Sequence, residues 1–133
     1  HGRYEDRWVN LKSASDQCVF LKGLDRMYLP IAHAEGRFVV QSKEVAQRLE
    51  QNGQLALRYT DDAGGEASGF PDNPNGAQCN VAGVSDRTGR VFGMMPHPER
   101  FIDGTQHPRW TREGLQDQGQ GMAIFRNAVE YFT

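Results

Sequence analysis

The segment PHPER, residues 96–100, places a histidine and a glutamate two positions apart, directly after a short apolar run. Pro98 favours an extended backbone at His97, and side chains two residues apart in an extended chain point to the same side. A carboxylate beside an imidazole holds one tautomer and stabilises the imidazolium that forms during proton transfer. Such an imidazole accelerates a reaction by roughly 10²–10⁴-fold as a general base and acid. The spacing alone leaves two interpretations open: His97 and Glu99 are two members of a catalytic triad, or a surface histidine has an acid beside it by chance.

A second histidine and glutamate with the same spacing, His33 and Glu35, precede a glycine at position 36. We favour a hydrogen-bonded pair that fixes the turn at Gly36; the alternative is a contact with substrate or a pocket wall. Arg37 and Arg100 are interpreted by default as salt-bridged surface residues, with binding of a substrate carboxylate or a partner domain as the alternative. A zinc site that combines the two His–Glu pairs is a third possibility, but nothing in the spacing brings the pairs together.

Neither cysteine has the surroundings of a nucleophile. Cys18 lies inside the apolar run CVFL, which is typical of a buried small hydrophobic residue. Cys79 is followed by Asn80 and Val81, without the glycine of a tight strand-to-helix elbow. The surroundings of the two cysteines therefore do not point to either of them as a partner of the His–Glu pair. No charged-then-apolar leader is visible, so we also expect a cytoplasmic protein with two reduced thiols and no disulfide.

The net charge does not favour electrostatic binding to nucleic acid or to an anionic membrane surface. The 133 residues include 17 acidic and 15 basic side chains, a formal net charge of −2, whereas such partners attract strongly basic surfaces. No apolar run approaches the roughly 20 residues of a membrane span. The length allows a single domain. Because the chain starts with a histidine and a strand pattern follows at once, we expect it to be cut from a longer polypeptide.

Alternation and short apolar runs predict a strand-rich chain. Strands are expected at residues 3–12, 18–21, 27–32, 36–40, 54–60, 81–84 and 91–95. The third contains Pro30, which favours a sheet edge or an irregularity. Residues 85–89 between the last two strands are a good hairpin connection, and residues 103–121 are expected to form a long loop.

Two helices complete the pattern. The first begins after an N-cap at Ser42 and ends at Asn52-Gly53. The second spans residues 122–132, and its spacing places five apolar residues on one face: Ile124, Phe125, Ala128, Val129 and Phe132. This order of elements fits half of an α/β domain with added antiparallel strands better than a complete doubly wound sheet.

Four segments in succession resemble class I glutamine amidotransferases of the purine synthase type. They are PIAHAEGRF at 30–38, NPNGAQCNVAGV at 73–84, VFGMMPHPER at 91–100 and MAIFRNAVEYF at 122–132. The four follow the order found in that family and cover nearly the whole chain. Two positions depart from the family pattern: Ala34 stands where glycine is usual, and Ala77 where serine is usual.

The resemblance implies a flavodoxin-like three-layer α/β sandwich, of which residues 1–133 form the C-terminal part of one amidotransferase domain. It implies a Cys-His-Glu triad in which His97 is the base, Glu99 orients it, and the cysteine lies in the missing upstream half. The reaction would be hydrolysis of the glutamine side-chain amide, with the ammonia passed to formylglycinamidine ribonucleotide synthesis in purine biosynthesis. The chain alone would be inactive; the alternative is a non-catalytic interaction module that has lost its nucleophile.

The same resemblance implies partners for this chain. An ATP-dependent synthase subunit or domain would consume the ammonia, so ATP and magnesium would belong to the synthase and this chain would hold no cofactor. The turn around Asn75 could face that synthase. Without its upstream half, the chain would expose a strand edge and an apolar face, so we expect it to be poorly soluble or to associate through that edge.

Overall fold

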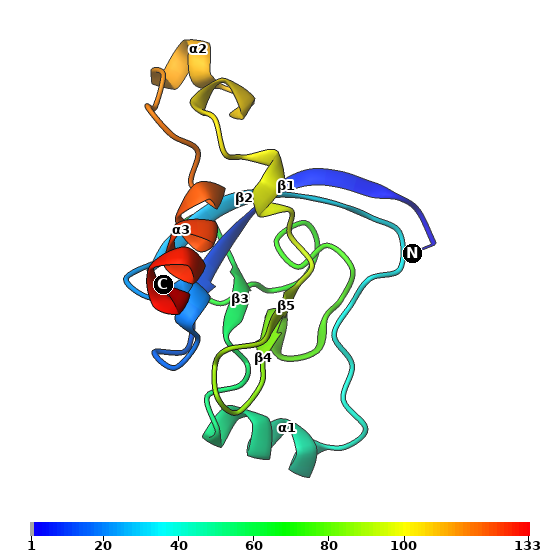
Figure 1. Ribbon diagram of the computed structural model, residues 1–133. Coiled ribbons are helices and arrows are strands. Elements are labelled where there is room, and N and C mark those ends of the chain that lie inside the picture. The colour runs from blue at the N-terminus through cyan, green and yellow to red at the C-terminus, as the bar shows by residue number, and fades with distance from the viewer. Residues whose placement is uncertain (1) are drawn as a thin grey trace.

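The structure, a computed structural model, describes residues 2–133. Its strands form one sheet in the order β2-β1-β3-β4-β5, in which all neighbouring strands are antiparallel (Figure 1). The strands are β1 (Glu5–Ser13), β2 (Arg26–His33), β3 (Leu57–Thr60), β4 (Val81–Ser85) and β5 (Phe92–Met94). The helices are α1 (Lys43–Gln51), α2 (Trp110–Glu113) and α3 (Gly121–Phe132). This combination confirms the predicted α/β class with antiparallel strands.

The core lies on one face of the two longest strands. Alternate residues of a strand share a face, and Val9 and Leu11 of β1 stand opposite Leu29 and Met27 of β2, all four of them buried. The opposite face carries Trp8, which lies against the rings of neighbouring aromatic residues. The two faces are therefore covered by different parts of the chain.

Helix α3 buries less of its apolar face than its sequence predicts. It packs against the 3₁₀ turn Val19–Leu21, and the Asn127 side-chain amide donates to the backbone carbonyl of Phe20 at 2.9 Å. Ile124 is only 4% exposed, whereas Phe125, Val129 and Phe132 are 42%, 61% and 59% exposed. Only part of the predicted apolar stripe therefore contacts the rest of this chain.

Two of the predicted strands are not strands. Residues 18–21 form a turn in which the Leu21 N–H donates to the Cys18 carbonyl at 3.1 Å, and periodicity cannot separate such a short buried turn from a short strand. Residues 36–40 have irregular backbone held by the loop that follows β3. The Gln78 N–H donates to the Phe38 carbonyl at 2.9 Å, and the Val40 N–H donates to Gln78 Oε1 at 2.7 Å. The backbone and the side chain of Gln78 thus form the hydrogen bonds that a neighbouring strand would otherwise make with this segment.

The first helix and the hairpin agree with the sequence. The Ser42 side chain accepts from the Val45 N–H at 3.3 Å, as expected of an N-cap, and β4 and β5 flank the predicted connection. The strand predicted at residues 54–60 is shorter in the structure, because β3 begins at Leu57. None of the helices in residues 2–133 combines the length and apolar character needed to cross a bilayer.

The predicted loop 103–121 is an arm that contains the short helix α2. Figure 1 shows α2 at the end of this arm, away from the sheet. The arm is closed at its base, where the Gly119 N–H donates to the Ile102 carbonyl at 3.0 Å and the Gly121 N–H donates to the Phe101 carbonyl at 2.8 Å. A side chain at Gly121 would overlap the Pro98 carbonyl, so this close contact requires glycine.

Candidate active site

His97 and Glu99 lie side by side, as their spacing predicts, but the backbone between them is not a strand. His97 (φ −104°, ψ 87°) is the N-cap of a 3₁₀ turn at Pro98–Arg100, and the Arg100 N–H donates to the His97 carbonyl at 3.1 Å. His97 Nδ1 and Glu99 Oε1 are 2.7 Å apart across this turn. Pro98 is buried at the first position of the turn, where its fixed φ suits a helical start. The predicted pair therefore forms through a turn and not along an extended segment.

The backbone of His97 is fixed to the edge of the sheet. Its N–H donates to the Pro30 carbonyl of β2 at 2.8 Å, and β2 is an edge strand in the described sheet. Proline has no N–H to offer on this edge, so the carbonyl of Pro30 is the group that holds the histidine. The sequence predicted a sheet edge or an irregularity at Pro30, and the edge is what the described sheet shows. A backbone carbonyl gives no signal in a sequence, so the contact with His97 was not foreseen.

The contact between Nδ1 and the carboxylate determines which nitrogen can act as a base. An ionised carboxylate only accepts hydrogen bonds, so His97 Nδ1 carries the proton and donates it to Glu99, and Nε2 is left with a free lone pair. Burial raises the pKa of Glu99, but the hydrogen bond from His97 and the nearby charges of His97 and Arg100 outweigh it, and the pKa lies below its usual value. The pair is therefore ready to accept a proton at Nε2.

Solvent still reaches the pair. The His97 side chain is 36% exposed and the Glu99 side chain 57% exposed. An ion pair in water contributes little, whereas proton transfer in enzymes takes place in sites that exclude water. The pair is oriented but not enclosed by the described residues.

His33 and Glu35, which have the same spacing, do not form a hydrogen-bonded pair. Both ring nitrogens of His33 are buried without a well-formed hydrogen bond, and Glu35 is exposed. The predicted hydrogen bond between them is therefore wrong. Burial, followed by the charge of His97, lowers the pKa of His33, against a smaller opposing effect of the Gly36 backbone. His33 ends β2, and a Cβ at Gly36 would lie 3.0 Å from its ring, so the turn is fixed by packing instead of by a side-chain pair.

Three other candidate residues gather at one hollow of about 350 Å³, which is lined by Ala34, Glu35, Arg37 and Asn75 together with Gly2. The Asn75 side-chain amide donates to the Gly36 carbonyl at 3.3 Å. Arg100 lies elsewhere, at the end of the turn that carries Glu99. The structure therefore separates the two arginines that the sequence left as alternatives for the same role.

The loop that carries Asn75 is held by an asparagine. Asn73 accepts from the Ala77 N–H at 2.9 Å through Oδ1 and donates to the Ala77 carbonyl at 2.8 Å through Nδ2. Ala77 itself is buried in the hydrophobic core. The loop is thus fixed through the backbone of Ala77, and it does not need the hydroxyl of the serine that is usual at this position.

The cysteines do not complete the site. Cys18 is fully buried, as predicted, and burial raises the pKa of its thiol. Cys79 is exposed, with a left-handed backbone (φ 54°, ψ 24°), and it lines a hollow with Lys12 and Arg58. Neither is a hydrogen-bond partner of His97. Across residues 2–133, no cluster of three or more His, Cys, Asp or Glu side chains is arranged to hold a metal ion.

Comparisons with known proteins agree with the resemblance. The sequence matches the CobB/CobQ-like glutamine amidotransferase domain family over residues 1–132. It is 47% identical over 131 residues to the phosphoribosylformylglycinamidine synthase subunit PurQ of Dehalococcoides mccartyi, covering 98% of this chain and 49% of that protein. The PurQ subunit of Archaeoglobus fulgidus is 46% identical over 134 residues, covering 97% of this chain and 47% of that protein.

A solved structure has the same fold over the whole of this chain. It is described as the structure of PurLQS from Thermotoga maritima, with a TM-score of 0.69 and 27% sequence identity, and the match covers 99% of this chain and 50% of that chain. The chain thus spans about half the length of the curated relatives and of the solved chain that it matches.

Proposed function

This chain belongs to the CobB/CobQ-like glutamine amidotransferase domain family, and we propose that it is the half of a glutaminase that carries the general base and the carboxylate that orients it. The observation that supports this most directly is the 2.7 Å contact between His97 Nδ1 and Glu99 Oε1, which leaves Nε2 free. The relatives are named as subunits of phosphoribosylformylglycinamidine synthase. The ammonia would accordingly serve formylglycinamidine ribonucleotide synthesis in purine biosynthesis.

The proposed reaction divides hydrolysis of an amide into two displacements. A thiolate attacks the side-chain amide carbon of glutamine and forms a tetrahedral intermediate. Protonated His97 delivers its Nε2 proton to the departing nitrogen, ammonia leaves, and a thioester remains. His97 then takes a proton from water through Nε2, the resulting hydroxide attacks the thioester carbon, and glutamate and the thiolate are released. Glu99 keeps the imidazole in one tautomer through both steps and stabilises it when it is charged.

Several parts of this activity would lie outside the chain. The nucleophilic cysteine would come from the upstream half of the domain, and without it the chain would not hydrolyse glutamine. A synthase subunit or domain would use the ammonia and would hold ATP and magnesium. The hollow lined by Glu35, Arg37 and Asn75 is a candidate contact with the substrate or with that synthase.

The test is glutamine hydrolysis by this chain, by its missing upstream half, and by the two together. Ammonia and glutamate are measured for native His97 and for His97→Ala. We expect release only from the combined halves, and a fall of about 10²-fold or more in the His97→Ala variant, because a general base is lost. His97→Ala also removes the donor of the proton that the departing nitrogen takes up, so the loss should appear in kcat.

Two results would overturn the proposal. Hydrolysis by this chain alone would mean that Cys18 or Cys79 is a nucleophile after all. An absence of hydrolysis in the combined halves, although they associate, would favour the non-catalytic interaction module that has lost its nucleophile.

A further inference from the structure

The hollow beside Cys79 has no role in the proposed reaction. It has a volume of about 340 Å³, and its lining includes Lys12, Arg58, Thr60, Glu66 and Cys79. We call it the Cys79 hollow. None of its described lining residues belongs to the turn that carries His97 and Glu99. The Cys79 hollow is therefore separate from the candidate active site.

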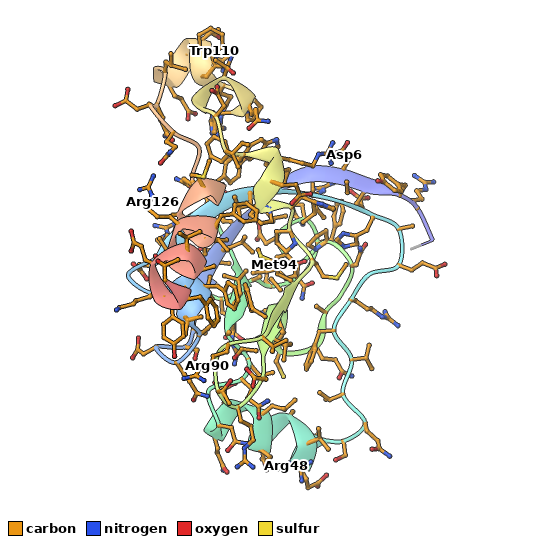
Figure 2. All side chains as sticks on the ribbon, viewed as in Figure 1. Asp6, Arg48, Arg90, Met94, Trp110 and Arg126 are labelled. Atoms are coloured by element: carbon orange, nitrogen blue, oxygen red, sulfur yellow. The ribbon has the colours of Figure 1, made fainter. Side chains whose placement is uncertain are left out.

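The Cys79 hollow is linked to helix α1. Arg58, which lines it, forms an ion pair with Glu50 of that helix. Figure 2 shows Arg48 of α1 at one end of the molecule and Trp110, on the arm, at the other end. The arm is therefore not part of this hollow.

Three basic residues face one another across neighbouring strands beside the hollow. Lys12 of β1 stands directly opposite Arg58 of β3 and, on its other side, directly opposite Arg26 of β2. Like charges in such positions repel each other. Arg58 is compensated by Glu50, whereas Lys12 is in no ion pair among residues 2–133. The Lys12 ammonium can therefore bind the carboxylate of a ligand.

Thr60 carries a buried hydroxyl group on the same side of the sheet. Its side chain shares a face of β3 with that of Arg58, because alternate residues of a strand point the same way, and both residues line the hollow. Thr60 is 5% exposed, and its Oγ1 has no hydrogen-bond partner among the described residues. Buried polar groups nearly always have a partner. The Thr60 hydroxyl therefore indicates a polar ligand group in the hollow.

Cys79 presents an accessible thiol on a fixed backbone. The Arg58 guanidinium donates to the Cys79 carbonyl at 2.6 Å, and the side chain of the next residue, Asn80, accepts from the Asn73 amide at 2.7 Å. Cys79 is exposed, whereas Cys18 is fully buried. These hydrogen bonds hold the backbone in place and leave the Cys79 thiol open to a molecule in the hollow.

The charges in the hollow suit a molecule that carries both signs. Glu66 pairs with Thr60 in an antiparallel bridge, so the two side chains lie on the same side. Glu66 is exposed and is in no ion pair within the described part of the chain. The end of an α-amino acid offers a carboxylate to Lys12 and an ammonium to Glu66. The Thr60 hydroxyl can donate to the first or accept from the second.

We propose that the Cys79 hollow binds a low-molecular-weight disulfide with free α-amino-acid ends, and that Cys79 forms a mixed disulfide with it. The Cys79 thiolate attacks one sulfur of the bound disulfide. A bond forms between Cys79 Sγ and that sulfur, and the original S–S bond breaks. The other half leaves as a thiolate and takes up the proton lost by Cys79. Cys79 is oxidised and the bound disulfide is reduced, so no further oxidant is needed.

The test measures the rate of mixed-disulfide formation at Cys79 by peptide mass spectrometry, in the chain of residues 1–133. The probes are oxidised glutathione and cystine, which have α-amino-acid ends and differ in length. They are compared with cystamine, which has no carboxylate, and with bis(2-hydroxyethyl) disulfide, which has no charge. Each rate is divided by that of the same disulfide with a peptide of residues 76–82, which contains Cys79 and lacks the hollow.

We expect at least one of the two amino-acid disulfides to react with Cys79 about 10-fold faster than either comparison disulfide after this correction, because the hollow adds ionic and hydrogen-bonding contacts. The faster of the two identifies the length of ligand that the hollow accepts. Cys18 is the internal control: it is buried, and it should remain unmodified while the chain is folded.

Two variants separate binding in the hollow from simple exposure of the thiol. Lys12→Ala removes the unpaired ammonium, and Thr60→Val replaces the unpartnered hydroxyl by a methyl group. Each should slow the reaction with the amino-acid disulfides by about 3-fold to 10-fold and leave the rate with the uncharged disulfide unchanged. The control is Lys22→Ala, which removes an exposed lysine that does not line the hollow and should change neither rate.

Equal corrected rates for the amino-acid and the uncharged disulfides, or equal modification of the two cysteines, would overturn the inference. Unchanged rates in both Lys12→Ala and Thr60→Val would also overturn it, because the thiol would then react through exposure alone. A variant that slowed all four disulfides equally would count against a ligand site, since access to the thiol would have changed instead of recognition. Glutamine hydrolysis is not part of this measurement, so the inference and the proposed function can fail separately.

Discussion

Two segments of this chain have the same spacing of histidine and glutamate, yet only one of them forms a pair. His97 and Glu99 are joined by a 2.7 Å contact and remain exposed to solvent. His33 is half-buried, and both of its ring nitrogens are buried without a hydrogen-bond partner, while Glu35 is exposed and lines a hollow with Arg37 and Asn75. The difference comes from the backbone that follows each histidine. A proline starts a turn after His97, whereas His33 ends a strand and is covered by neighbouring side chains.

The comparison teaches that a His-x-Glu spacing does not by itself make a catalytic pair. A turn brings the two side chains together and leaves one ring nitrogen accessible, which proton transfer requires. A buried imidazole without partners is costly, because each lost hydrogen bond of a buried polar group costs about 1–3 kcal/mol. The first segment has the geometry that proton transfer needs, whereas the second has no side-chain pair.

The largest expected effect is on the rate. In the combined halves, Glu99→Gln should reduce kcat for glutamine hydrolysis by about 10²-fold or more, because an amide does not hold the same tautomer or stabilise the imidazolium. The matched control is Glu35→Gln, which has the same spacing and no contact with its histidine; it should change KM at most. A kcat that falls equally in both variants would contradict the distinction between the two segments.

An effect of intermediate size, on folding stability, is expected at Gly36, which lies between the His33 segment and the His97 segment. A Cβ at Gly36 would overlap the terminal methyl of Met95 and would lie 3.0 Å from the ring of His33. The Met95 methyl is the end of a flexible side chain and can move aside, so Gly36→Ala should reduce the free energy of unfolding by only about 1 kcal/mol, the low end for overpacking, when measured by urea denaturation. Gly93→Ala, where a Cβ has no neighbour within 4 Å, is the control and should be nearly neutral. If the two alanine variants were equally stable, Gly36 would not be tightly packed.

The smallest expected effect is a loss of folding stability at mildly acidic pH. The pKa of His33 is lowered by burial and by His97, so the unfolded chain binds more protons than the folded chain just below the usual histidine pKa of about 6.5. Stability should therefore fall as the pH drops from about 6.5 through the lowered pKa of His33. His33→Leu should make the free energy of unfolding less dependent on pH in that window. A ring resonance of His33 that titrates at or above the ordinary value in NMR would disprove this.

How much of the site could be predicted is clear from individual residues. Local features were accessible: the Ser42 cap, the hairpin between β4 and β5, the edge position of Pro30 and the burial of Cys18 all follow from residue type and its nearest neighbours. The strand expected at residues 36–40 was wrong because the Gln78 side chain and loop backbone bind it. Such bonds join residues about forty positions apart, and local periodicity carries no information about them.

The apolar face of α3 also shows that local sequence patterns do not predict tertiary contacts. The sequence placed five residues on one stripe, and the structure buries Ile124 but leaves Phe125, Val129 and Phe132 exposed. A hydrophobic pattern says which residues can be buried. What covers each of them depends on which other elements are present.

The sequence by itself determined the candidates: His97 and Glu99 at a spacing that allows contact, no nucleophile of recognisable type, and an order of segments that resembles one family. These follow from side-chain chemistry and from spacing along the chain. Only the tertiary structure decided that Glu99 reaches its histidine while Glu35 does not, that the Pro30 carbonyl holds His97, and that Cys79 shares a hollow with Lys12 and Thr60. The physical reason is that backbone hydrogen bonds and unfilled volume are made by residues distant in sequence, and they exist only once the chain has folded.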